Sequence, residues 1–245
     1  MEKIKAFIAK FSPYLEDIRK RLYKISILFA LLFVVGFLST SQILKHILSL
    51  FNIKDVVIAT TSPFQFADLS INIGLFTAFL ISCPILVYHI FMFLKPALTK
   101  KERGLFFFLL PVTLILFSVG FIYGFLILYY ALILLAQINN TIGVKNIWDI
   151  GMFLSQIVLT STLLGVLFQF PIICTFALKL GLLDVNFLRE KRRLAVLIIF
   201  IFTSLLPPTD GLSLLAMALP LILLYEVTIL VNSRFGKHKI INNLI

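Results

Sequence analysis

The stretch FMFLKPALTKKERG (Phe91–Gly104) is a short charged segment between two long apolar runs. It contains a single carboxylate, on Glu102, and four cations: Lys95, Lys100, Lys101 and Arg103. The nearest charged residues outside it are Asp68 and Lys145. Each flanking run is therefore longer than the roughly 18 apolar residues that mark a membrane-spanning helix. Glu102 is either neutralised by its neighbouring cations or available to a cation from another molecule.

The composition of the whole chain agrees with this local pattern. Hydrophobic residues make up 60% of the sequence and charged residues only 13%, against about 25% charged in an ordinary soluble domain. We predict an all-α, polytopic membrane protein with one membrane domain over residues 1–245. The first apolar run is expected to stay uncleaved, because no small-residue cleavage pattern follows it.

The distribution of Lys and Arg predicts the orientation of the chain. Six spans account for the apolar runs: residues 22–38, 69–94, 105–136, 152–183, 194–206 and 212–231. Lys and Arg are concentrated in both tails and in the segments 95–103 and 179–193, whereas the alternate segments carry only Lys45, Lys54 and Lys145. Because loops rich in Lys and Arg stay in the cytoplasm, both termini are predicted to be cytoplasmic.

The predicted spans are uneven in length. Residues 194–206 would reach only about 20 Å as a helix, short of the roughly 30 Å hydrocarbon core of a bilayer. Four prolines lie inside spans, where each removes a backbone hydrogen bond and favours a kink: Pro84, Pro111, Pro171 and Pro220. Uneven, kinked helices predict a cupped bundle rather than a straight cylinder.

The external segments carry two further signals. In the first, Ile43, Ile47, Leu48 and Phe51 recur at helical spacing, which predicts a short amphipathic helix on the membrane surface. The second contains the sole tryptophan, Trp148, which is expected to be an anchor at the membrane interface.

Signatures of enzymatic chemistry are missing from the sequence. There is no phosphate-binding Gly-rich loop and no Gly-x-Ser-x-Gly elbow. Cys83 and Cys174 are too few and too isolated for a metal site or a disulfide framework, and His89 is interpreted as a packing residue. We predict no enzyme activity, no metal and no cofactor. The net charge of +11 is interpreted as a topology signal with some attraction to anionic lipid, not as a nucleic-acid surface.

Two polar residues inside the predicted spans need partners, because the bilayer interior does not solvate them. Gln169 lies near the middle of the fourth span. Its amide either forms a hydrogen bond between helices or is a functional polar group in the wall of a cavity. Glu226 lies near the cytoplasmic end of the sixth span. It could reach the surface, pair with Arg234 or another cytoplasmic cation, or serve in a proton relay.

The N-terminal segment 14–22, YLEDIRKRL, predicts an amphipathic helix that runs into the first span. Glu16 precedes Lys20 by four residues, and Asp17 precedes Arg21 by four, a spacing that favours ion pairs within the helix. The predicted topology places this acidic pair on the same membrane face as Glu102.

Together these motifs resemble the TatC family, the polytopic core of the twin-arginine protein translocase. The resemblance covers nearly the whole chain and depends on the order and spacing of short motifs rather than on any single one. The motifs are LEDIRKRL (15–22), SPF (62–64), CPIL (83–86), FLKPAL (93–98), KER (101–103), FQFP (168–171), PPTD (207–210), ALP (218–220) and LYE (224–226).

The resemblance implies a function in protein export. The family exports folded proteins whose signal peptides carry an Arg-Arg pair, using the proton-motive force without nucleotide. It implies TatA- and TatB-type single-span subunits, signal peptides and the lipid bilayer as partners, and self-association. It also implies a multi-pass protein of the cell membrane, with an organelle inner or thylakoid membrane as the other location.

The resemblance also assigns site residues. The two signal-binding carboxylates of the family correspond to Asp17 and Glu102. An arginine guanidinium suits such a site because its planar fork can donate two parallel hydrogen bonds to one carboxylate, which lysine cannot do. Four further residues match family positions and are expected to contribute: Arg19, Phe93, Asp210 and Glu226.

Three departures from the family pattern are visible. The family usually has Glu at the position of Asp17, and Glu16 stands beside it as a possible substitute. Relatives commonly have Glu where this chain has Gln169, and an amide does not titrate. The proline of the first external loop is absent, since SLFN occupies residues 49–52. A secondary transporter for a small solute is the alternative function, but the sequence shows none of the internal repeats that it predicts.

Overall fold

The computed structural model describes residues 2–50, 56–94, 100–179 and 181–241. Five helical segments among them are long and apolar enough to cross a membrane, which agrees with the prediction of a polytopic helical membrane protein. They lie in α1 (Glu2–Leu38), α3 (Gln65–Leu94), α4 (Lys100–Thr141), the pair α5 (Ile150–Leu167) and α6 (Phe170–Lys179), and α9 (Gly211–Ile241).

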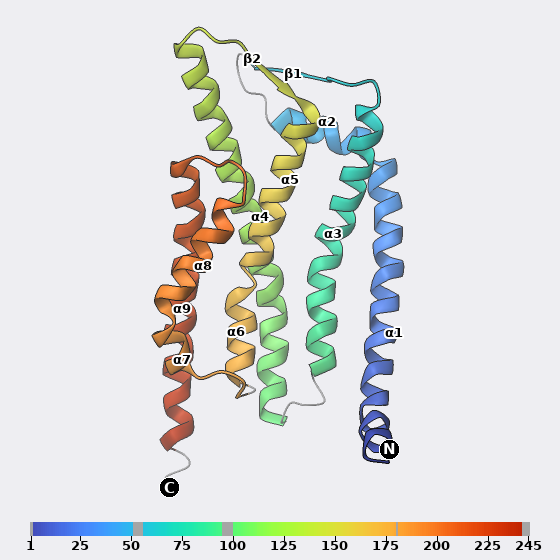
Figure 1. Cartoon of the computed structure of the whole chain (residues 1–245), viewed down its shortest axis with the longest axis vertical. Helices are drawn as coiled ribbons and strands as arrows, with labels where there is room; N and C mark the ends of the chain where they lie inside the picture. Colours follow the sequence, from blue (N-terminus) through green and yellow to red (C-terminus); the bar gives the residue numbers. More distant parts are fainter. Residues whose placement is uncertain (1, 51–55, 95–99, 180, 242–245) are drawn as a thin grey trace. The chain divides into compact units, whose positions relative to one another are not determined.

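The short fifth span of the prediction corresponds to α8 (Arg192–Ser204), which follows α7 (Val185–Glu190). With 13 residues, α8 is too short to count among the five membrane-length helices. Its length is about 20 Å, as the sequence predicted. α8 packs against the longer α9, and the two lie side by side in Figure 1.

The fourth predicted span is interrupted rather than continuous. α5 ends at Leu167 and α6 begins at Phe170, with Phe168 and Gln169 in a turn between them. Pro171 has no N–H with which to bond the carbonyl four residues earlier, which interrupts the helix. The break therefore lies beside a proline for which the sequence predicted a kink. The other three prolines lie inside the continuous helices α3, α4 and α9.

The chain divides into two compact units. The first consists of residues 1–50 and 66–110, with α1, α2 (Thr40–Leu50) and α3. α1 and α3 approach closely at two glycines, because a Cβ on Gly36 would lie 2.7 Å from Thr77 Cβ and a Cβ on Gly74 would lie 3.0 Å from the Phe33 ring. α2 is the predicted amphipathic helix of the first external segment; Phe51 lies outside the described residues.

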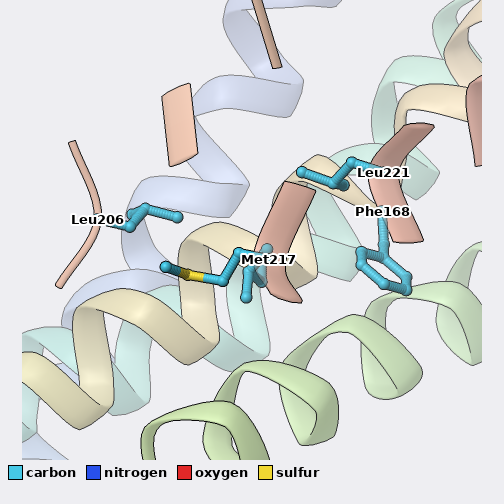
Figure 2. Packing of buried hydrophobic residues seen from close by; sticks show 5 residues of the cluster. Phe168, Leu206, Met217 and Leu221 are labelled. Carbon is cyan, nitrogen blue, oxygen red and sulfur yellow. The ribbon is translucent and has the colours of Figure 1, made fainter. Parts of the chain in front are cut away.

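The second unit consists of residues 51–65 and 111–245. One buried cluster joins side chains from α5, the α5–α6 turn, the segment after α8 and α9: Leu164, Phe168, Leu206, Met217 and Leu221. Figure 2 shows the cluster, with the last four of these residues labelled. α4 packs tightly on α5, since a Cβ on Gly120 would lie 2.6 Å from Phe168 and a Cβ on Gly124 would lie 2.8 Å from the Ser161 backbone. Glycine at both positions allows this close helix contact.

The all-α prediction holds for the membrane helices but missed a small sheet. β1 (Val56–Ala59) pairs in parallel with β2 (Asn146–Asp149), with Val56 opposite Asn146 and Ala59 opposite Asp149. Parallel strands need a long crossover connection, which α3 and α4 supply here. Four-residue strands so distant in sequence leave little periodicity from which to predict their pairing.

Candidate functional site

The acidic pair of α1 forms two ion pairs within the helix. Lys20 Nζ lies 2.8 Å from Glu16 Oε1, and Arg21 Nε donates a 2.9 Å hydrogen bond to Asp17 Oδ2. Both pairs join residues four positions apart, as the sequence predicted. The hydrogen bond from Lys20, and then its charge, lower the pKa of Glu16 below its usual value.

Asp17 remains accessible despite its bond to Arg21. Its side chain is 47% exposed, whereas that of Arg21 is only 25% exposed. Arg19 is exposed on the same helix, but it lies two residues from Asp17 and so faces a different direction. The acid therefore has a cationic neighbour on its own face and an open approach from solvent.

Glu102 and Phe93 can be followed only through their backbone. Glu102 lies in the first turn of α4 and Phe93 near the end of α3, in the same compact unit as Asp17. The side chains of both residues fall outside the described part of the structure. The pairing of Asp17 with Glu102 around one cation therefore stays a prediction.

Gln169 bridges two helices of the second unit. Its side chain is 2% exposed, and its Nε2 donates a 3.0 Å hydrogen bond to the carbonyl oxygen of Thr113 in α4. Its Oε1 is buried and has no hydrogen-bond partner among the described residues. The amide group of Gln169 thus joins the turn between α5 and α6 to α4, which is the first of the two roles predicted for it. Its oxygen remains as an acceptor without a donor among the described residues.

The two acids predicted around α9 have separate structural roles. Arg192 Nη2 lies 3.1 Å from Glu226 Oε2, so the partner of Glu226 is Arg192; the side chain of Arg234 is outside the described residues. Asp210 caps the start of α9, because its Oδ2 accepts a 2.8 Å hydrogen bond from the Ser213 amide. Sixteen residues, or about 24 Å of helix, separate the two acids, so they do not form one site.

The sequence analysis missed a carboxylate at the strand pair. Asp149 Oδ2 accepts hydrogen bonds from the Thr61 hydroxyl and, at 2.7 Å, from Gln65 Nε2, while Oδ1 accepts a 2.8 Å bond from the Met152 amide. The bond from Thr61, followed by those from Met152 and Gln65, lowers the pKa of Asp149 to about 2. Its position just before α5 was the one available signal, since Asp is a favoured N-cap residue.

We call Asp149, Thr61 and Gln65 the carboxylate clasp. Gln65 Oε1 also accepts a 2.7 Å hydrogen bond from the Thr61 amide, so all three residues are mutually connected. The clasp joins the segment after β1, the start of α3 and the start of α5. With the Met152 amide, the clasp supplies three donors to one carboxylate, which favours the ionised form.

Comparisons with known proteins agree on one family. The model of the family described as Sec-independent protein translocase protein (TatC) matches residues 13–220. The Bacillus subtilis protein TatCy is 25% identical over 237 residues, covering 95% of this chain and 92% of the relative. The Listeria innocua TatC is 30% identical over 229 residues, covering 89% of each protein.

Solved structures give the same result. A crystal structure of the twin-arginine translocase receptor TatC in the detergent DDM superposes with a TM-score of 0.77 at 26% sequence identity. The match covers 89% of this chain and 98% of that one. A second crystal structure of the same receptor gives a TM-score of 0.75 at 25% identity.

Proposed function

The chain belongs to the TatC family of Sec-independent protein translocase proteins, and from this premise we propose that it binds twin-arginine signal peptides at the membrane face that carries both of its termini. It is a multi-pass membrane protein and a component of a protein translocase.

The observation that carries the proposal is the half-exposed Asp17–Arg21 pair. Among the described residues, one bond, from Arg21 Nε, holds one oxygen of Asp17, and exposed ion pairs are worth only about 0–1 kcal/mol. An incoming guanidinium can donate two parallel charge-assisted hydrogen bonds to the same carboxylate. Arg21 therefore holds and orients Asp17 in the resting state, and an arginine of the signal peptide replaces it on binding.

Glu102 is the proposed second ligand, so that each arginine of the pair meets one carboxylate. In the sequence it stands among three cations, Lys100, Lys101 and Arg103. Arg19 and Phe93 are proposed as secondary contacts beside the two acids, and Glu16 as a weaker alternative acid to Asp17. The family match gives no support to the alternative of a small-solute transporter.

The proposal extends to the apolar part of the signal peptide and to the partner subunits. We place both near Gln169, whose buried Oε1 offers an acceptor among apolar side chains. TatA- and TatB-type single-span subunits, together with the proton-motive force, complete the proposed machinery. Because an amide carries no titratable proton, no proton-transfer step in this chain passes through residue 169.

A crosslinking experiment tests the binding site. Membranes containing the full chain are incubated with a twin-arginine precursor that carries a photoreactive residue beside the Arg-Arg pair. The double variant Asp17→Asn with Glu102→Gln is expected to lose about tenfold or more of the crosslinked product, because two charge-assisted pairs are removed. The matched control is Asp184→Asn, an exposed acid that makes no capping hydrogen bond. Crosslinking by the double variant at the level of this control would rule out the site.

A further inference from the structure

An apolar pocket lies on the second unit between the α5–α6 break, α8 and α9. It encloses about 190 Å³, more than the roughly 150 Å³ apolar cavity that stays dry and binds benzene in a well-studied protein. α8 contributes Ala195, Ile198, Ile199 and Phe202 to its wall. On the other side the rings of Phe170 and Tyr225 stack with centroids 5.7 Å apart. A ligand for this pocket must be apolar where it enters.

The pocket is open to the surroundings of the helices. Among its lining residues, Ile198 is 42% exposed, Phe202 52% and Phe170 38%. In a chain that spans a membrane, exposed apolar side chains on a helix of this kind face lipid. The acyl chains of the bilayer are therefore the apolar groups in direct reach of the pocket.

Cations gather at the N-terminal end of α8. Arg192 lies one turn before Ala195, so it continues the stripe of α8 residues that lines the pocket. Its ion pair with Glu226 is only half buried, since both side chains are exposed by more than two fifths. Three more cations beside it are exposed, at Arg189, Lys191 and Arg193. The described acids at this end are Glu190 and Glu226, so the local charge is positive.

We propose that the pocket and these cations form a binding site for an anionic phospholipid. One acyl chain lies in the pocket along α8, and the phosphate group meets Lys191, four residues before Ala195, at the membrane surface, where Arg193 adds to the positive charge. Ala195 and Phe202 are separated by about 10 Å of helix, a depth that lies within one leaflet of a hydrocarbon core about 30 Å thick. Charge at one end and an apolar wall below it match the structure of a phospholipid.

The length of α8 supports a resident lipid. A helix of 13 residues reaches only about 20 Å, so the bilayer beside it must thin or its lipids must tilt. An undeformed bilayer would leave some exposed apolar side chains beside α8 in incomplete contact with lipid. A lipid whose acyl chain lies in the pocket covers these side chains. The site therefore relieves a mismatch that the short helix creates.

Charge distinguishes a lipid from a transmembrane helix of a partner protein at this site. Membrane helices carry Lys and Arg at their cytoplasmic ends, so a partner helix would bring cations toward Lys191 and Arg193. A phosphate group is attracted to the same two residues, and each Lys or Arg near a membrane surface contributes about fivefold to the binding of anionic lipid.

Native mass spectrometry of the full chain tests the site. The protein is released from mixed micelles that contain phosphatidylglycerol and phosphatidylcholine with the same acyl chains. We expect it to retain phosphatidylglycerol selectively, and the double variant Lys191→Gln with Arg193→Gln to lower that selectivity at least about fivefold. Lys145→Gln removes an exposed cation of the β2 loop and should leave the selectivity unchanged. Equal retention of the two lipids by the parent protein would overturn the proposal.

A second arm tests the pocket without touching any charge. Ile198→Trp fills the pocket and is expected to reduce lipid retention about tenfold relative to Leu197→Trp, a neighbouring residue that is 55% exposed and does not line the pocket. Equal retention by both variants would contradict the site. In membranes, a photoreactive Ile198→benzoylphenylalanine variant should gain the mass of a phospholipid; a product dominated by a single-span protein would show instead that a partner helix occupies the pocket.

Discussion

Asp17 and Asp149 are both accessible carboxylates, yet the structure holds them in different ways. Within the described part of the chain, Asp17 accepts one hydrogen bond, from Arg21 one helical turn away. Asp149 has three donors, two of which come from Thr61 and Gln65, more than eighty residues earlier in the chain. The number and origin of the donors separate an acid that is free to exchange its partner from an acid that holds segments together.

Replacing the single bond of Asp17 by a better one costs the protein only a local ion pair. Replacing any donor of Asp149 disturbs the link between the two external segments. We therefore expect ligand binding to depend on Asp17 and stability to depend on Asp149, with little overlap between the two effects.

The largest expected effect is on signal-peptide binding at residue 17. Asp17→Asn should lower the affinity for a twin-arginine peptide about tenfold, because an amide cannot form a charge-assisted pair with both guanidinium donors. Asp17→Glu, the residue usual in the family, should stay within about threefold of the parent. Fluorescence titration in nanodiscs measures both. An equal loss in both variants would mean that geometry, not charge, fixes the role of this residue.

The next effect is on stability at the carboxylate clasp. In Asp149→Asn the new amide presents N–H donors toward Thr61 and Gln65, which are themselves donors in the parent protein. The thermal midpoint should fall by about 2–4 °C, which corresponds to the loss of a typical hydrogen-bond contribution in a protein of this size. Peptide affinity should not change. A parallel loss of affinity would remove the separation between the two acids.

The pH dependence of stability sharpens the same contrast. The pKa of Asp149 is lowered to about 2, from about 3.9 in an unfolded chain. A lowered pKa stabilises the fold above the unfolded value, and this contribution is lost as the pH falls from about 4 through about 2. The difference in midpoint between the parent and Asp149→Asn should be constant from pH 7 to about 4.5 and vanish toward pH 2. Thermal melts across this range measure it, and a difference that vanished near neutral pH would contradict the assignment.

The smallest effect is expected at Glu16. Its pair with Lys20 joins two side chains that are each about two-thirds exposed, and such pairs contribute little to stability. Glu16→Gln should therefore shift the thermal midpoint by less than about 1 °C and peptide affinity by less than about threefold. A tenfold loss of affinity would make Glu16, rather than Asp17, the principal arginine ligand.

Most of the fold follows from local patterns in the sequence. The apolar runs predicted the membrane helices, the shortness of α8 followed from residues 194–206, and the position of Pro171 anticipated the break after α5. The i, i+4 spacing predicted both ion pairs of α1 correctly. Each of these features depends on residues within a few helical turns of one another.

The features that sequence analysis missed depend on distant segments. β1 and β2 pair across two membrane helices, and the clasp joins residues 61, 65 and 149. Glu226 pairs with Arg192, 34 residues earlier, a partner that the sequence left open among the cytoplasmic cations. Hydrophobic periodicity carries no information about which loops meet or which side chain at a helix end finds which partner.

A double-mutant cycle between peptide and protein tests the central claim most directly. The affinities of an Arg-Arg peptide and its Lys-Lys counterpart are measured for the parent chain and for Asp17→Asn in nanodiscs. If Asp17 recognises a guanidinium fork, the parent should prefer the Arg-Arg peptide by about tenfold or more, and Asp17→Asn should lose most of that preference. An Arg-Arg preference that is the same in both proteins would contradict direct recognition by Asp17.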